Sequence, residues 1–317
     1  MRRLCLRATG ARSAGRSGLS SVRQLFADAG RVGGAARRLL ATIALLAALG
    51  AAAALVWPDR VVPAAAAQAG GPPASGGGAG DRSAAAPDAD RTLGLRWRFA
   101  RVQYTAHNAD SFRARYWSDS WAIDGPAAEQ NLSRRVRTVT AIDVEDPVQI
   151  QLESPELWDN PWIYFVEPGT LRLKEAEVPI LREFLLRGGT ATFDDFHGPI
   201  EWNNLVGELR RVFPDRQIVE LAPPHPIYNC FYEIDHYPQV PGLGSFIQGR
   251  TWEKGGFVSH LRAIEDDRGR AMVLINWNTD MGDGMEWSNA TEYPGYATHT
   301  ADAYRMMINE IIYSLTH

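Results

Sequence analysis

Cysteine is scarce in this chain of 317 residues, which contains only Cys5 and Cys230. Cys5 belongs to a basic N-terminal arm, so Cys230 has no partner for a disulfide in the rest of the chain, and a CxxC metal motif is absent. Cys230 stands among aromatic residues, in a context without an activating base or a group that would lower its pKa. We therefore predict a buried, unreactive thiol at this position.

Other common signatures of function are missing as well. The seven His include no H-E-x-x-H motif or comparable pair, so a zinc enzyme has no support, and we expect no cofactor. Residues 1–60 contain ten Arg, no Lys and two acidic residues, and since the whole chain carries −4, residues 61–317 carry −12. This acidic balance argues against nucleic acid as a partner.

The N-terminal third is built for export rather than for a folded core. Residues 1–38 form a basic arm, and residues 39–57 form an uncharged run long enough to span a bilayer as a helix. This run is either a transmembrane helix or the apolar part of a cleaved signal, with Ala67-Gln68-Ala69 as the cleavage site. The Arg-rich flank predicts a cytoplasmic N-terminus. Residues 58–92, rich in Ala, Gly and Pro, predict a disordered linker.

Either route places the remaining residues, 93–317, in the periplasm, tethered to the inner membrane or secreted. In this part, apolar periodicity predicts strands over residues 97–104, 148–152, 161–166, 190–193 and 217–221, and helices over residues 126–139, 173–187, 199–212 and 298–315. Two further strands, 256–265 and 270–277, flank a turn. The alternation predicts one α/β domain with a doubly wound, flavodoxin-like sheet.

One block concentrates polar chemistry after a buried strand. The strand over 190–193 follows Gly188-Gly189 and ends in Asp194, Asp195 and His197. Ligands bind at the carboxyl ends of strands in open α/β sheets, so these three are the candidate catalytic residues. Because successive strand residues face opposite ways, we expect one Asp to cap the helix that begins near Pro199 and the other to enter a cleft with His197. A purely structural capping role is the alternative.

Several motifs carry a family resemblance across residues 97–317. They are Trp121-Ala122-Ile123-Asp124, the strand Pro161–Phe165, the Gly188–Gly198 block with its Asp-Asp-Phe-His-Gly, Val212-Phe213-Pro214, His225-Pro226-Ile227 and Asn309…Tyr313. The chain resembles the bacterial domain-of-unknown-function family 4159. That family is similar in fold to class I glutamine amidotransferases and to the trehalose-utilisation protein family.

The resemblance implies a comparison with amidotransferase chemistry. Class I amidotransferases place a Cys nucleophile on a strained strand-to-helix elbow, whereas the equivalent tip here offers Asp194, Asp195 and His197 and no Cys, Ser or Thr. This departure excludes glutaminase chemistry of that kind. Two hypotheses remain: a ligand-binding or scaffold domain of the cell envelope, with a small molecule, a glycan or envelope proteins as partners, or a hydrolase, acting for example on glycans. We favour the binding role.

A second polar segment follows the strand over 270–277. It contains Asp280, Asp283 and Glu286 between Asn276 and Trp287. Oxygen-rich loops of this kind can hold Ca²⁺ or Mg²⁺, but the spacing does not match an EF-hand. We therefore expect no metal and an ordinary loop that lines the cleft beside Asp195. The predicted ligand-binding residues are Trp121, Asp124, Asp280, Asp283, Glu286 and His225.

Overall fold

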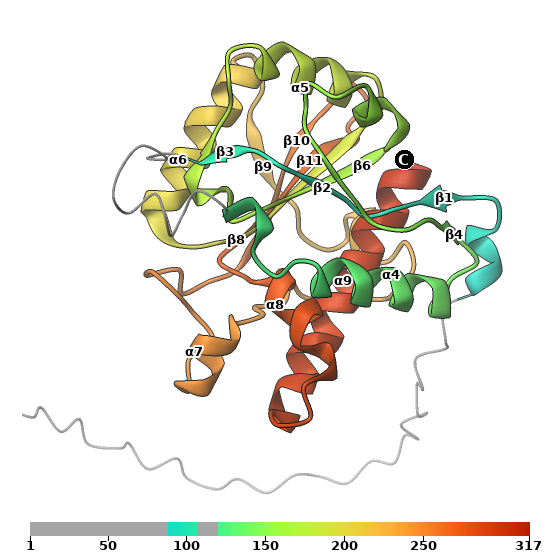
Figure 1. The fold of residues 1–317 in the computed structure, drawn as a ribbon, viewed down its shortest axis with the longest axis vertical. Helices are drawn as coiled ribbons and strands as arrows, with labels where there is room; N and C mark the ends of the chain where they lie inside the picture. Colours follow the sequence, from blue (N-terminus) through green and yellow to red (C-terminus); the bar gives the residue numbers. More distant parts are fainter. Residues whose placement is uncertain (1–87, 107–119) are drawn as a thin grey trace, which may run out of the picture. The chain divides into compact units, whose positions relative to one another are not determined.

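A computed structural model describes residues 88–106 and 120–317, which belong to the compact unit Gly80–His317 (Figure 1). A seven-stranded sheet forms its centre, in the order β5 (Val148–Ile150), β2 (Ala100–Val102), β6 (Trp162–Val166), β8 (Thr190–Phe196), β11 (Ala271–Trp277), β10 (His260–Glu265) and β9 (Ile218–Glu220). The strands β5, β2, β6, β8 and β11 are parallel, and β10 is antiparallel to both its neighbours. The prediction of an α/β domain with a mostly parallel sheet is confirmed.

Helices cover both faces of this sheet, as Figure 1 shows. On one face, α4 (Ala127–Val139), α8 (Met281–Glu286) and α9 (Ala297–Thr316) share an apolar core with Trp162 and Leu274. On the other face, α5 (Glu177–Leu186) and α6 (Gly198–Val212) pack on Phe165 and Phe193. The central strands β6 and β8 are buried along their whole length, as expected for parallel strands covered on both sides.

Shorter elements complete the fold. The strands β1 (Arg96–Trp97) and β4 (Asp143–Val144) form a parallel pair, and β3 (Thr105–Ala106) pairs antiparallel with β7 (Leu171–Arg172). The helix α7 (Leu243–Ile247) lies in the connection between β9 and β10. Single turns of 3-10 helix are η2 (Ala89–Thr92), η3 (Ser120–Ala122), η4 (Pro155–Asp159), η5 (Pro168–Thr170), η6 (Pro226–Tyr228), η7 (Trp287–Asn289) and η8 (Pro294–Tyr296).

Strand β8 contains a β-bulge that shapes the site. Ile275 of β11 pairs with Phe193, but Trp277, two residues later, pairs with Phe196, three residues later. One extra residue is therefore inserted on β8 between Phe193 and Phe196, where Asp195 has φ +58°. Phe193 and Phe196 consequently lie in the same apolar core, although an odd spacing would place them on opposite faces of a regular strand.

Four predictions about local structure were wrong in detail. The opening strand over 97–104 is broken into β1 and β2, and β8 extends past residue 193 because the bulge preserves its pairing. The predicted linker 58–92 ends before η2, because Thr92 is buried and its hydroxyl accepts a hydrogen bond from the backbone N–H of Ala141 (2.7 Å). Residues 281–286 form helix α8 instead of a loop.

The predictions for the N-terminal region mostly lie outside the described residues. They are the basic arm 1–38, the apolar segment 39–57 and the linker up to residue 87. In residues 88–106 and 120–317, none of the helices combines the length and apolar character needed to cross a bilayer.

Candidate functional site

The polar residues of the site gather where parallel strands end. Asp124 lies in the connection after β2, Glu167 directly after β6, Asp195 in the bulge of β8 and Asn278 directly after β11. All four have positive φ, as does Lys254, and these are the five non-glycine residues with positive φ in the described part of the chain. Such conformations cost free energy and concentrate at functional sites. The strand order also reverses between β2 and β6, which is where ligands bind in sheets of this type.

Asp194 has a structural role in the described fold. Its carboxylate is fully buried and accepts hydrogen bonds from the hydroxyl of Tyr164 (2.6 Å) and from the backbone N–H groups of Met281 (3.4 Å) and Gly282 (3.0 Å). These N–H groups begin α8, so Asp194 caps that helix from a neighbouring strand. Burial raises the pKa of Asp194 to about 6, against the effect of these hydrogen bonds.

The start of α6 was predicted to be capped by one of the two aspartates, and this prediction was wrong. The N-cap residue of α6 is His197, whose side chain makes no capping hydrogen bond. The backbone N–H of His197 donates to Glu201 (2.6 Å), and the N–H of Gly198 donates to Asn278 Oδ1 (2.9 Å). Glu201 in the first turn of α6 and Asn278, directly after β11, therefore satisfy the donors that the aspartates were expected to take.

Asp195 and His197, which the sequence predicted to enter a cleft together, form a buried pair in the structure. Asp195 Oδ1 lies 3.3 Å from Nε2 of His197, and the two side chains are 9% and 1% exposed. Burial, followed by the nearby charge of Asp194, raises the pKa of Asp195 well above its usual value. Burial lowers the pKa of His197, which favours the neutral imidazole. This pair can hold a proton between a carboxyl group and an imidazole.

Asp195 also belongs to an acidic cluster, which we define as Asp124, Asp195, Asp280 and Asp283. Carboxylate oxygens of Asp124, Asp280 and Asp283 lie within 4.8 Å of one another. Burial and the charge of Asp195 raise the pKa of both Asp124 and Asp280 well above the ordinary range. Glu286 lies beside the cluster, and burial together with Asp283 raises its pKa to about 7. The structure therefore brings together carboxylates from distant segments that the sequence assigned to one site.

Helix α8 and its neighbours hold the cluster in place. Asp280 is the N-cap of α8 and accepts a hydrogen bond from the N–H of Asp283 (2.7 Å). The carboxylate of Asp283 accepts from the N–H of Leu243 (2.6 Å) and from Nε1 of Trp287 (3.0 Å). These bonds fix both carboxylates against the start of α8.

A buried arginine positions the connection that carries Asp124. Arg101 on β2 is paired with Glu129 of α4 and donates to the carbonyl oxygens of Trp121 (3.2 Å) and Ile123 (2.9 Å). Trp121 thus lies near the cluster through its backbone, while its ring packs partly buried against the α5–α6 core. The sequence gave no indication of the Arg101–Glu129 pair.

A second group beside Asp195 was missed by the sequence reasoning. We call it the lysine network: Glu167, His197, Glu201 and Lys254. Lys254 Nζ lies 2.8 Å from Glu201 and 3.8 Å from Glu167. Burial raises the pKa of Glu167 to about 8, while Glu167 and Glu201 raise the pKa of Lys254 against the effect of its own burial. Two signals could have found it: Glu167 directly follows a buried strand, and Lys254 is one of two Lys in the chain.

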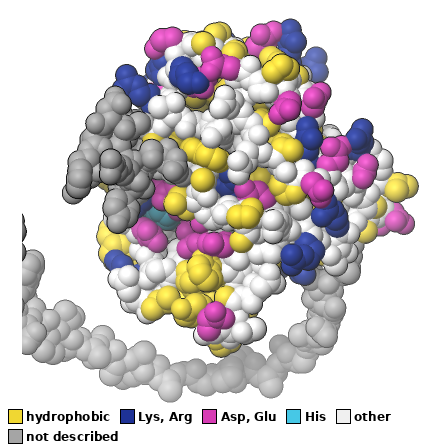
Figure 2. Space-filling view, viewed as in Figure 1, with side chains coloured by type: hydrophobic (Ala, Val, Ile, Leu, Met, Phe, Trp, Pro, Cys, Tyr) yellow, Lys and Arg dark blue, Asp and Glu magenta, His cyan; other side chains and the backbone are white. Residues whose placement is uncertain are grey.

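The segment around Lys254 covers the Asp195–His197 pair. A Cβ at Gly198 would lie 2.1 Å from the carbonyl oxygen of Lys254, and Asn278 Nδ2 donates to the carbonyl of Val258 (2.6 Å). The backbone of residues 254–258 therefore packs directly on the ends of β8 and β11. Figure 2 shows acidic side chains beside a histidine on this face of the molecule.

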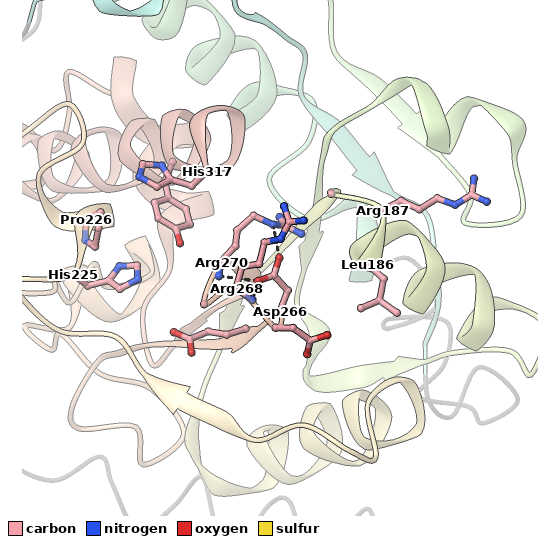
Figure 3. A pocket seen from close by; sticks show the side chains of 13 residues that line it. Leu186, Arg187, His225, Pro226, Asp266, Arg268, Arg270 and His317 are labelled. Carbon is pink, nitrogen blue, oxygen red and sulfur yellow. Dashed lines mark hydrogen bonds and ion pairs between the residues drawn. The ribbon is translucent and has the colours of Figure 1, made fainter.

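His225 lies apart from the acidic cluster. Its Nδ1 accepts a hydrogen bond from the N–H of Ile227 (3.3 Å), and its ring lies 5.4 Å from that of Tyr313. It lines a cavity of about 710 Å³ at the amino ends of β8 and β11, together with Arg268 and His317 (Figure 3). The structure therefore brings five of the six predicted ligand-binding residues to the carboxyl ends of the parallel strands and places His225 near their amino ends.

This cavity carries both signs of charge, and its central arginine is engaged in the fold. Arg270 donates to the carbonyl oxygens of Leu185 (2.9 Å) and Gly189 (3.2 Å) and pairs with Asp266 (3.2 Å). These contacts tie the end of α5 to the turn between β10 and β11.

Comparison with known proteins assigns the chain to a family. The model of the family described as Domain of unknown function (DUF4159) matches residues 98–315. No curated protein matches the chain.

Proposed function

Since the chain belongs to the DUF4159 family, a family defined without an activity, we propose its function from the site: a ligand-binding domain of the cell envelope that takes a small, positively charged ligand at the acidic cluster. The proposal rests mainly on one observation. Three carboxylates from separate positions, Asp124, Asp280 and Asp283, converge within 4.8 Å. Grouped carboxylates repel one another when ionised, and a bound cation removes that repulsion.

The surrounding residues favour an added cation over an internal one. Arg101, the buried guanidinium nearest this region, is already paired with Glu129 and two backbone carbonyls. Lys254 is paired with Glu201 and Glu167. The cluster therefore has more carboxylates than the described cations around it can neutralise. A flavodoxin-like or amidotransferase-like scaffold is consistent with the parallel strand order, and the switch point between β2 and β6 lies beside Asp124.

The binding proposal is tested by thermal unfolding of the purified chain with a panel of probes. The panel contains CaCl₂, MgCl₂, spermidine and glucosamine, with glucose as a neutral sugar. At least one cationic probe should raise the unfolding temperature of the wild type, and Asp280→Asn should abolish that shift while keeping the N-cap of α8. Asp302→Asn on α9 is the matched control, because that side chain is 39% exposed and pairs with Arg305 (3.7 Å). Equal responses of the wild type and Asp280→Asn would refute the proposal.

A hydrolase is the second candidate, favoured by the geometry of Asp195. Its left-handed φ of +58° at a strand-to-helix connection and its 3.3 Å approach to His197 suit a general base or a nucleophile. Both side chains are covered, so a substrate would have to displace residues 254–258. Release of nitrophenol from nitrophenyl glycosides by the wild type, lost in Asp195→Asn, supports this activity. Equal release by both proteins rules it out.

The location in the envelope is tested separately. Membrane fractionation of cells that produce the full chain should find it in the inner membrane, with residues 93–317 accessible from the periplasm. N-terminal sequencing distinguishes the two routes, because a mature chain that begins near Gly70 would mean a cleaved signal. Recovery of the intact chain in the cytoplasm would contradict both.

A further inference from the structure

We infer that the ligand of the acidic cluster is a hard divalent cation, with Ca²⁺ as the best fit, held by Asp124, Asp280 and Asp283. This inference rests on the proposed function and specifies the ligand. The sequence predicted no metal here, because the spacing of Asp280, Asp283 and Glu286 does not match an EF-hand. The third carboxylate comes from Asp124, more than 150 residues earlier, so the donor set exists only in the folded chain.

The separation of the oxygens fits one ion. Ca²⁺ binds oxygen ligands at about 2.3–2.6 Å, so ligands on opposite sides of the ion are about 5 Å apart. Carboxylate oxygens of the three Asp lie within 4.8 Å of one another, so all three can contact the same Ca²⁺. Mg²⁺ requires about 2.0–2.1 Å and near-octahedral geometry, which demands a tighter site.

One carboxylate oxygen of Asp124 without a hydrogen-bond partner is independent support for a bound ligand. Oδ2 of Asp124 is shielded from solvent and has no hydrogen-bond partner. Buried carboxylate oxygens without a donor are costly, so this atom calls for a cation or a proton. It lies on the side of Asp280, because a Cβ added to Gly282 would lie 2.0 Å from Asp124 Oδ2 and 3.4 Å from Asp280 Oδ1.

Two glycines leave room for the carboxylates to converge. The Gly282 position shows that Asp124 and Asp280 approach the same backbone atom of α8. A Cβ added to Gly242 would lie 2.5 Å from Oε1 of Glu253, 2.9 Å from Asp280 Oδ2 and 3.4 Å from Asp283 Oδ2. Glu253 therefore brings another oxygen close to the same group, which suits the six to eight oxygen ligands of Ca²⁺.

The test measures binding and stability of the full chain with CaCl₂ and MgCl₂ after treatment with EDTA. Calorimetric titration of the wild type should show one Ca²⁺ bound per chain, with weaker binding of Mg²⁺. Asp124→Asn and Asp280→Asn should each weaken Ca²⁺ binding at least about tenfold. Both substitutions suit their positions, since Asn tolerates the left-handed φ of residue 124 and caps helices at residue 280. Asp302→Asn is the control and should bind Ca²⁺ like the wild type.

A reversal of relative stability separates a ligand role from a merely structural one. In EDTA, the two cluster variants should unfold at the same temperature as the wild type or higher, because each replaces a carboxyl group whose ionised form is repelled by its neighbours. In CaCl₂, the unfolding temperature of the wild type should be higher than in EDTA, and that of the variants should be unchanged. If neither CaCl₂ nor MgCl₂ changes the unfolding temperature of the wild type, the calcium inference is overturned. In that case, a shift with spermidine or glucosamine leaves the broader binding proposal standing, and a response to no cationic probe refutes both.

Discussion

Gly198 offers a sharp test of how the covering segment is held over the site. Its φ is +70°, and a Cβ there would lie 2.1 Å from the carbonyl oxygen of Lys254. Gly269, in the turn between β10 and β11, has φ +81° and open space around the same position. Gly198→Ala and Gly269→Ala therefore share the cost of a left-handed Ala, and only the first adds a collision with backbone.

The two costs can be separated in magnitude. A left-handed Ala costs about 1–2 kcal/mol, offset by about 0.4–1 kcal/mol because Ala restricts the unfolded chain more than Gly does. We expect Gly269→Ala to lower the free energy of unfolding by about 1 kcal/mol or less. Overpacking against the backbone of Lys254 adds about 1–3 kcal/mol, so Gly198→Ala should lose about 2–4 kcal/mol in urea unfolding.

A proteolysis assay reports where the strain is relieved. The chain has two Lys, Lys174 and Lys254, so a lysine-specific protease can cut it at two places only. If the segment around Lys254 moves away from β8, cleavage after Lys254 should become faster in Gly198→Ala, while cleavage after Lys174 changes little. Gly269→Ala should cleave like the wild type at both. Equal unfolding free energies and cleavage rates for the two variants would refute the argument.

Three further outcomes follow from single groups. Tyr164→Phe removes the hydroxyl that donates to Asp194 and should lower the free energy of unfolding, measured in urea, by about 1–3 kcal/mol. An unchanged urea midpoint would contradict the structural role of Asp194. Burial raises the pKa of Glu310 to about 8. The contribution of Glu310 to the free energy of unfolding is therefore fully present below its unfolded pKa near 4.5 and is lost as pH rises through 8. Glu310→Gln should flatten the fall in unfolding temperature between about pH 5 and pH 9, and parallel curves for variant and wild type would argue against this reasoning. Burial raises the pKa of the Cys230 thiol to about 12. Peptide mapping should therefore find Cys230 alkylated slowly in the folded chain at pH 8 and quickly in urea. Fast alkylation under both conditions would mean a reactive thiol.

The fold was largely predictable because its signals are local. Continuous apolar runs indicated the central strands, and apolar stripes indicated α4, α6 and α9 within a few residues. Helix α8 was not predictable, because Asp280-Met281-Gly282-Asp283-Gly284 has weak helix propensity. The start of α8 is stabilised from outside, by the carboxylate of Asp194 on another strand. Contacts across the sheet of this kind leave no periodic trace in the sequence.

The candidate site was predictable in its location but not in the roles of its members. The rule that ligands bind at the carboxyl ends of parallel strands led to Asp195, His197 and Asp280, which the structure places at those ends. The alternation rule assigned the two aspartates to opposite faces but could not tell which one is structural. Lys254 and Glu167 were missed because their partners are distant in sequence.

The bulge in β8 adds one residue to a strand that would otherwise pair regularly with β11. Removal of Asp195 alone would leave Phe193 and Phe196 separated by one residue, the spacing of a regular strand, and would restore one-to-one pairing with β11. The sheet is therefore complete without this residue, and the Asp195 carboxylate is a one-residue insertion into a self-sufficient scaffold. A single-codon deletion should thus yield a folded chain that has lost one corner of its site, whereas deletion of Asp194, Phe193 or Phe196 would also remove a core or capping side chain.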